Sequence, residues 1–504
     1  MNAARTRPLA RSEDRSRDNA VRQFAFSAYV GLCICWLSAW GWQGEGPGRV
    51  HTMVVATWVC LAAVLAIILA AQRRLIGSPS FWILAFAGKF ALSLALTQFA
   101  WFEPLAPDLL RVPKAIPGVQ DANLYDYYAL QALHDGILNS WDTLNFTWLS
   151  FGVTGYLALV YRVFGVSVAY VSMCNALLSF GGLMMLSATL RKLFGPERIW
   201  DLIVLATFIP SIAYYDSTPA KEPLTHCLFY TSLFILTGLI WRREIRLGRL
   251  IQAVVALGLL SVVRANVVLL LVASNAWPVL RRIGFWRALS IGILCAALAI
   301  GTLIGVTGST KSLVDLFDLN GRFEQTAGFI EERSAEGESG LKQAVAEKFA
   351  PTNIGNLLLW SPLRAMIWFY LPYPLLVPSL DGISSPPTLR YEARLEKVRA
   401  VHDQAFVLTG WLLILATPFL IGAAWSLLKN RNVGLRMLLF NIAGSAMLIG
   451  NLMFVMGRRY RTLIEPLVLA VVLVAMQYRL GRKLIWPVWV TMVVGVVLVA
   501  VLRV

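Results

Sequence analysis

Apolar residues along the chain gather in long uninterrupted runs, separated by short polar segments rich in Lys and Arg. Runs of about 15–25 residues match the length of a helix that crosses the hydrocarbon core of a bilayer. A backbone in lipid has to satisfy its own hydrogen bonds, so each run predicts a helix. The candidate spans are Phe24–Trp42, Met53–Ala71, Phe81–Trp101, Val166–Leu190, Trp200–Tyr214, Pro223–Trp241, Leu250–Val263, Asn266–Leu280, Ala288–Gly305, Ala405–Leu427, Met437–Val455, Leu463–Gln477 and Ile485–Val501.

This pattern predicts an all-α polytopic membrane protein, and the composition agrees with it. Hydrophobic residues make up 58% of the 504 residues and charged residues only 14%, whereas a soluble domain carries roughly 25% charged residues. The net charge of +17 would suggest a nucleic-acid partner in a soluble protein. Here Lys and Arg lie in short loops, where they set orientation and meet anionic lipid, so we expect no nucleic-acid partner.

The basic residues also orient the predicted bundle, because cytoplasmic loops of membrane proteins are enriched in Lys and Arg. We expect residues 1–22 to form a basic cytoplasmic tail and residues 23–504 to form a single transmembrane domain. The large loops outside are then 102–165, which holds the candidate catalytic segment, and 306–404.

Two further apolar stretches must not cross the membrane if every inside loop is to stay basic. They are Phe146–Phe164 and Leu357–Leu376, and both contain Trp, Tyr and Arg. Such residues are typical of segments that lie at the membrane interface. We therefore expect both stretches to lie on the outer surface.

The first outside loop contains a carboxylate in register with two phenols. On a helix, Asp121, Tyr125 and Tyr128 share one face. A carboxylate in low-dielectric surroundings can serve as a general base, since burial raises its pKa toward neutrality. The alternative is that Asp121 only caps the helix that it begins.

A second candidate site is the segment Asp216–Pro223, at the outer start of a predicted span. Its Lys221 and Glu222 are adjacent at the bilayer boundary and could hold a polar substrate. Glu222 in the first turn of a helix also suits the helix dipole, which is the structural alternative.

Two groups of arginines complete the candidates. The apolar stretch Leu250–Leu280 is too long for one span, and splitting it near Arg264 places that arginine at an outer turn. A guanidinium there could bind phosphate, or it could extend toward lipid head groups. The cluster Gly457–Arg461 is basic although the predicted orientation places it outside. A lipid-linked phosphate substrate would explain this position, and the alternative is an error in the predicted orientation.

Several stretches occur in an order shared with a known group of membrane enzymes. They are Asp121…Tyr125…Ala129, Gly155-Tyr156…Val163-Phe164-Gly165-Val166-Ser167, Leu190-Arg191-Lys192…Pro196, Ile209-Pro210-Ser211 followed by Lys221-Glu222, and Arg459-Tyr460-Arg461…Glu465-Pro466. In this order the chain resembles bacterial membrane glycosyltransferases of the GT-C fold, the superfamily of the lipid A aminoarabinose transferases and protein O-mannosyltransferases.

The apolar runs predict about 13 transmembrane helices. The resemblance implies that they form a GT-C-like bundle, with juxtamembrane helices in the first large outside loop. It also implies a polyprenyl-phosphate sugar donor, a glycan or glycolipid acceptor, and a location in the bacterial cytoplasmic (inner) membrane with the active site on the periplasmic side. No metal ligands are expected from the sequence, and a divalent metal cofactor is left open. The roles implied are Asp121 as base, Glu222 as second acid, Tyr125, Asp126 and Lys221 as substrate contacts, and Arg264, Arg458, Arg459 and Arg461 as ligands of the lipid phosphate.

Two other functions fit a polytopic protein with arginines on its outer face. One is an oligosaccharide-repeat polymerase of the O-antigen or exopolysaccharide type, which would use a pyrophosphate-linked repeat unit. The other is a non-catalytic transporter of lipid-linked sugars, which would favour inverted repeats and ionisable residues at the bilayer midplane. No such repeat is evident in the sequence.

Overall fold

Every regular element in the described part of the chain is a helix. The computed structural model describes residues 79–101, 120–135, 151–164, 166, 168–241, 247–283, 359–370, 391–429, 432–452, 461–480, 486–491 and 494. The elements are α3 (Pro79–Trp101), α4 (Gln120–Asp135), α5 (Phe151–Phe164), α6 (Val168–Phe194), η4 (Arg198–Phe208), α7 (Pro210–Asp216), α8 (Glu222–Trp241), α9 (Leu247–Ile283), α15 (Ser361–Tyr370), α16 (Tyr391–Lys429), α17 (Val433–Leu452) and α18 (Glu465–Gln477).

Some of these helices are long and apolar enough to cross a membrane. Tyr170–Phe194 of α6 and Gln404–Leu427 of α16 meet both conditions, and the bent pair of η4 and α7 makes a third if it counts as one span. Phe81–Ser93 of α3 and Val433–Met447 of α17 are shorter apolar helices. These helices support a membrane protein, which agrees with the class that the sequence predicts.

The predicted total of about 13 spans reaches beyond the described residues. Phe24–Trp42, Met53–Ala71 and Ala288–Gly305 lie outside them, and Ile485–Val501 lies mostly outside them. The count and the orientation of the bundle therefore stay predictions. Of the two stretches expected not to cross, the described parts are the short helices α5 and α15.

The predicted span Trp200–Tyr214 is not one straight helix. The chain forms the 3₁₀ helix η4 up to Phe208 and then bends by 64° into α7. The bend has a local cause: Pro210 disfavours helical dihedrals at the residue before it, and Ile209 adopts φ −59°, ψ 126°. Pro210 then occupies the first turn of α7, where its missing N–H costs no hydrogen bond.

Helix α9 is broken where the sequence predicts a break. Arg264 has φ −159° and ψ 89°, which is extended backbone, and the residues on either side of it are helical. The break falls close to the middle of the run Leu247–Ile283 and gives two shorter helices instead of one of 37 residues.

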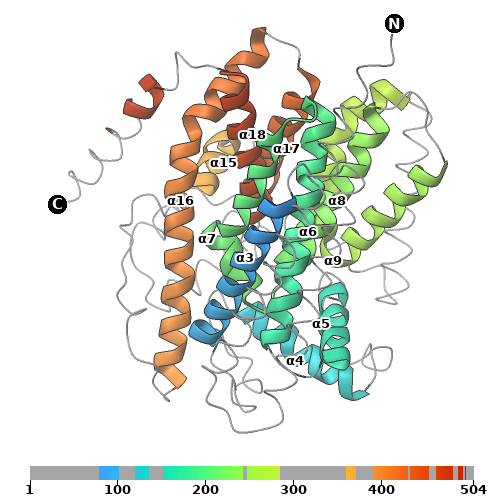
Figure 1. Cartoon of the computed structure of the whole chain (residues 1–504), viewed down its shortest axis with the longest axis vertical. Coiled ribbons are helices and arrows are strands. Elements are labelled where there is room, and N and C mark those ends of the chain that lie inside the picture. The colour runs from blue at the N-terminus through green and yellow to red at the C-terminus, as the bar shows by residue number, and fades with distance from the viewer. Residues whose placement is uncertain are drawn as a thin grey trace, which may run out of the picture.

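The bundle has two chemically different ends. Figure 1 shows α4 and α5 together at one end, which we call the α4 end. Helix α6 begins beside α5 and, at 27 residues, extends about 40 Å away from it. Its last turn carries Arg191 and Lys192, so we call the opposite end the Arg191 end.

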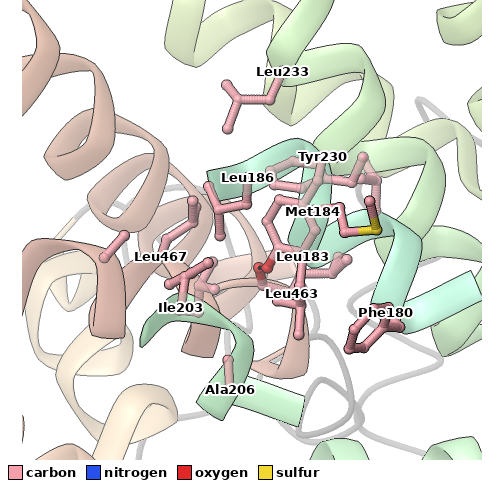
Figure 2. Packing of buried hydrophobic residues seen from close by; sticks show 14 of the residues in the cluster. Phe180, Leu183, Met184, Leu186, Ile203, Ala206, Tyr230, Leu233, Leu463 and Leu467 are labelled. Carbon is pink, nitrogen blue, oxygen red and sulfur yellow. Dashed lines mark hydrogen bonds between the residues drawn. The ribbon is translucent and has the colours of Figure 1, made fainter. Parts of the chain in front are cut away.

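The core between the ends is a layer of aliphatic and aromatic side chains. Helix–helix association within lipid rests on close van der Waals packing, since lipid tails are as apolar as the side chains. Figure 2 shows this packing with side chains of α6, η4, α8 and the start of α18, among them Phe180, Leu183, Leu186, Ile203, Ala206, Leu233, Leu463 and Leu467.

Helix α6 approaches the backbone of α8 closely at Gly182. A Cβ atom at Gly182 would lie 3.0 Å from the Cα of Cys227 and 3.1 Å from the carbonyl oxygen of His226, and both neighbours are backbone atoms. A Cβ at the adjacent Gly181 would meet nothing within 4 Å. The α6–α8 contact therefore depends on one glycine and not on the other.

Replacing Gly182 with alanine is expected to destabilise the protein by about 1–3 kcal/mol, because the two helices must separate. The matched variant Gly181→Ala should be neutral or stabilise by up to about 1 kcal/mol through helix propensity. Thermal unfolding of both variants in detergent measures the difference. Equal unfolding temperatures would contradict the close packing at Gly182.

Candidate functional site

A buried ion pair joins the break in α9 to the start of α8. The Arg264 guanidinium lies 2.5 Å from the Glu222 carboxylate, and the two side chains are only 1% and 2% exposed. Glu222 is the first residue of α8, where the helix dipole favours a negative charge. The break at Arg264 begins a second helix, so two helix N-termini meet near this carboxylate.

Lys221 extends the pair toward α4. Its ammonium lies 5.3 Å from the centre of the Tyr125 ring, within the range of a cation–π contact. The next residue of α4, Asp126, accepts a hydrogen bond from the Tyr161 hydroxyl of α5. Helices α4 and α5 are thereby fastened to each other beside Lys221. We call Lys221, Glu222 and Arg264 the Glu222–Arg264 site.

Asp121 is one helical turn before Tyr125 on the same face of α4. The helix that the sequence predicts for this segment is present from Gln120 to Asp135. The side chain of Asp121 lies outside the described atoms. Its role as a base therefore stays a prediction from the sequence.

A second buried ion pair supports the bent span. Lys89 of α3 lies 2.5 Å from Asp216 at the end of α7, and both side chains are fully buried. Lys89 also donates to the carbonyl oxygen of Thr207, 3.0 Å away, just before the bend. Ser179 of α6 donates to the other oxygen of Asp216 at 2.5 Å. Lys89 thus binds the segment on both sides of the bend at Ile209.

The turn between α7 and α8 is held by side chains of neighbouring helices. The Asn175 amide of α6 donates to the Thr218 carbonyl at 2.7 Å, and Tyr156 of α5 donates to Asn175 at 2.9 Å. Thr97 of α3 donates to the Ser217 carbonyl at 3.2 Å. Buried carbonyls of an irregular turn need such donors. The turn is therefore fixed in place, and with it the position of Glu222.

Arg461 is part of a third buried ion pair. Its guanidinium lies 3.2 Å from Glu465, and it donates to the carbonyl oxygens of Phe369 and Phe406 at 3.3 and 3.4 Å. Glu465 accepts a hydrogen bond from the Ser211 hydroxyl at 2.5 Å. Arg461 thereby connects α15, α16 and α18. Arg458 and Arg459 lie outside the described residues.

The Arg461 group adjoins the Glu222–Arg264 site through His226, one turn after Glu222 on α8. The Nε2 atom of His226 lies 3.0 Å from the Thr462 hydroxyl. The Tyr230 hydroxyl, one turn further along α8, donates to the Leu463 carbonyl at 2.7 Å. His226 is also close enough to Arg264 and Lys89 for both positive charges to act on it. The start of α18 therefore packs on the first turns of α8.

Tyr214 of α7 packs beside one boundary of the apolar part of α16. The rings of Tyr214 and His402 are 5.2 Å apart, and the apolar stretch of α16 begins two residues later at Gln404. Asp216, at the end of α7, lies two residues after Tyr214. The end of α7 therefore lies beside the start of this apolar stretch.

The structure brings together most of the described residues that the sequence predicts as a site. Tyr125, Lys221, Glu222 and Arg264 meet at the α4 end, and Arg461 adjoins them through Thr462 and His226. The arrangement differs from the prediction in one respect. Arg264 and Arg461, expected as phosphate ligands, each have a carboxylate partner, because a buried guanidinium requires a counter-charge.

No functional role was predicted for Lys89 or Ser179 from the sequence, and Glu465 entered only as part of the motif that carries the resemblance. A signal for Lys89 was available, since a lysine within an apolar run is costly and seldom without a role. Among the described residues, no group of three or more His, Cys, Asp and Glu side chains is placed to hold a metal ion. Comparisons of the chain with protein-family models, curated proteins and solved structures found no match.

Proposed function

We propose that the protein transfers a sugar from a polyprenyl-phosphate donor to a glycan or glycolipid acceptor of the cell envelope, at the outer face of the cytoplasmic membrane. The observation that carries the proposal is the Arg264–Glu222 pair beside Lys221, buried at the α4 end. It supplies cations for a phosphate and a carboxylate for a hydroxyl within one small region. The order of motifs that resembles GT-C glycosyltransferases supports the same reaction class.

The reaction requires few groups. The acceptor hydroxyl gives its proton to a carboxylate, for which Asp121 is the candidate base. The hydroxyl oxygen forms a bond to the anomeric carbon, and the bond from that carbon to the phosphate oxygen breaks. The phosphate leaves with the electron pair as polyprenyl phosphate. Cations that face the leaving oxygen lower the barrier, because negative charge develops there in the transition state.

The level of the site suits such a donor. A polyprenyl chain stays in the bilayer while its phosphate and sugar lie at the bilayer boundary, and we propose that this boundary lies at the level of Tyr214, His402 and the start of α8. The donor is then already oriented toward the site, and an oriented reactant loses less entropy in the transition state.

The test is transfer by the purified protein. It is incubated with a panel of radiolabelled polyprenyl-monophosphate sugars and with membrane glycolipid and glycan acceptors. A labelled acceptor with one added sugar is the expected product. Transfer only from pyrophosphate-linked repeat units would favour a polymerase, and transfer from no donor would refute the proposal.

The position of the α4 end is testable in intact cells. A cysteine in place of Gln120, the first residue of α4, is expected to react with a membrane-impermeant thiol reagent added from outside. A cysteine in place of Arg198, beyond the Arg191 end of α6, should react only after lysis. The opposite pattern would contradict an active site on the outer face.

A further inference from the structure

In the Glu222–Arg264 site, the guanidinium that a phosphate would bind already has a carboxylate partner. Arg264 is the candidate phosphate ligand nearest the middle of the site, yet its guanidinium is bound to Glu222 at 2.5 Å. Helix α5 covers the region before the break: a Cβ atom at Gly152 would lie 3.0 Å from the carbonyl oxygen of Val262. A phosphate that binds Nη2 of Arg264 therefore has to take the place of the carboxylate.

We propose that the donor phosphate exchanges with Glu222 on Arg264, and that the exchange releases the Glu222 carboxylate for the acceptor. The inference rests on the proposed function and deepens it. In the exchange the Arg264–carboxylate contact breaks and an Arg264–phosphate contact forms, with no covalent change. The released carboxylate stays at the first turn of α8, where the helix dipole continues to stabilise its charge.

The charges of the site allow this exchange. Lys221, Glu222 and Arg264 together carry a formal charge of +1, and the phosphodiester of a polyprenyl-phosphate sugar carries −1. The complex is thus neutral overall, which a buried location requires. Guanidinium binds phosphate and carboxylate with the same two-pronged geometry, so phosphate is a fitting substitute. The helix that begins after Arg264 adds a second N-terminal dipole that favours an anion.

The opposite end of the bundle, the Arg191 end, offers an ion pair for comparison. Arg191 lies 2.5 Å from Asp201, the same separation as Arg264 from Glu222. It joins α6 to η4 far from α4, and Trp82 also donates to Asp201 at 3.1 Å. Removing the Asp201 carboxylate changes a guanidinium partner without touching the site.

The experiment measures binding of a polyprenyl-phosphate sugar, the phosphodiester donor itself, to the full-length protein in nanodiscs. Glu222→Gln removes the competing charge but keeps a hydrogen-bonding group. It is expected to tighten binding about tenfold to a hundredfold, because a charge-assisted hydrogen bond no longer has to be broken. In the double variant Glu222→Gln/Arg264→Gln this gain in affinity should disappear. Asp201→Asn should bind like the wild type.

Further arms identify the ligand. The matching polyprenol, which lacks the phosphate, should show no difference between the wild type and Glu222→Gln. Inorganic phosphate tests whether the lipid is required: a tightening with the lipid phosphate alone assigns the site to a membrane-borne donor, and an equal tightening with inorganic phosphate assigns it to any phosphate. The second result would overturn a lipid-donor site.

The two proposals fail in different ways. Unchanged or weaker binding to Glu222→Gln, or equal tightening in Asp201→Asn, would overturn the exchange while leaving transfer in the wild type intact. Absence of phosphate-dependent binding and of transfer in the wild type would overturn the proposed function. If Glu222→Gln does not fold, Glu222→Asp provides the test, since a shorter carboxylate competes less well and should tighten binding to a smaller degree.

Discussion

Replacing Lys89 with methionine is expected to lower the free energy of unfolding by about 3–5 kcal/mol, because the change leaves the Asp216 carboxylate buried without its cation. Both side chains are fully buried and lie 2.5 Å apart. The variant also removes the donor to the Thr207 carbonyl beside the bend. Thermal unfolding in detergent, followed by circular dichroism, measures the loss.

The double variant Lys89→Met/Asp216→Asn separates charge from packing. It removes both charges, so most of the lost stability should return. Lys192→Met at the Arg191 end is the control. Lys192 is only half-buried and its ammonium donates to the Phe234 carbonyl beside the Phe234 ring, so its loss should cost about 1–2 kcal/mol, less than the loss of Lys89. A double variant as unstable as Lys89→Met alone would contradict a role for the ion pair.

Changing Glu222 to glutamine is expected to reduce sugar transfer by a factor of about 10²–10⁴, the usual contribution of a positioned acid or base. The amide has nearly the same shape and can still bond to Arg264, so the protein should fold. What it lacks is the negative charge of the proposed second acid, which acts beside the candidate base Asp121. The reduction should appear in kcat, measured with saturating donor and acceptor.

The same variant should bind the lipid phosphate more tightly, and the opposite signs of the two effects are diagnostic. A residue that only stabilised the fold would weaken binding and turnover together. Glu465→Gln shows the effect of changing such a structural carboxylate. Glu465 is as buried as Glu222, at 2% exposed, but it pairs with Arg461 and accepts a hydrogen bond from Ser211 of α7. Loss of turnover with wild-type donor affinity in Glu222→Gln would support catalysis without the exchange.

The apolar runs, and the charged residues that interrupt them, predict many of the described helices well. The apolar run predicts a span over Pro223–Trp241, and α8 covers Glu222–Trp241. The break at Arg264 follows from the length of its apolar stretch and from one charged residue near its middle. The bend at Ile209 was missed although Pro210 signals it, because the run continues as apolar on both sides of the proline.

The partners of the charged residues could not be predicted in the same way. Glu222 and Arg264 are 42 positions apart, and Ser211 and Glu465 are 254 positions apart. No local preference sets such pairs; they follow from which helices pack side by side. Sequence patterns located the charges at the ends of predicted helices, but their pairing, and hence the neutralised state of Arg264 and Arg461, depends on the assembled bundle.

The central claim is that a lipid phosphate binds at the α4 end, and photo-crosslinking tests it most directly. A polyprenyl-phosphate sugar with a photoactivatable group next to its phosphate is irradiated with the wild-type protein, and the labelled peptides are sequenced by mass spectrometry. We expect labels in α4, in residues 217–226 and around Arg264, all suppressed by unlabelled polyprenyl phosphate. Labels confined to the Arg191 end, or labels that excess polyprenyl phosphate does not reduce, would contradict the claim.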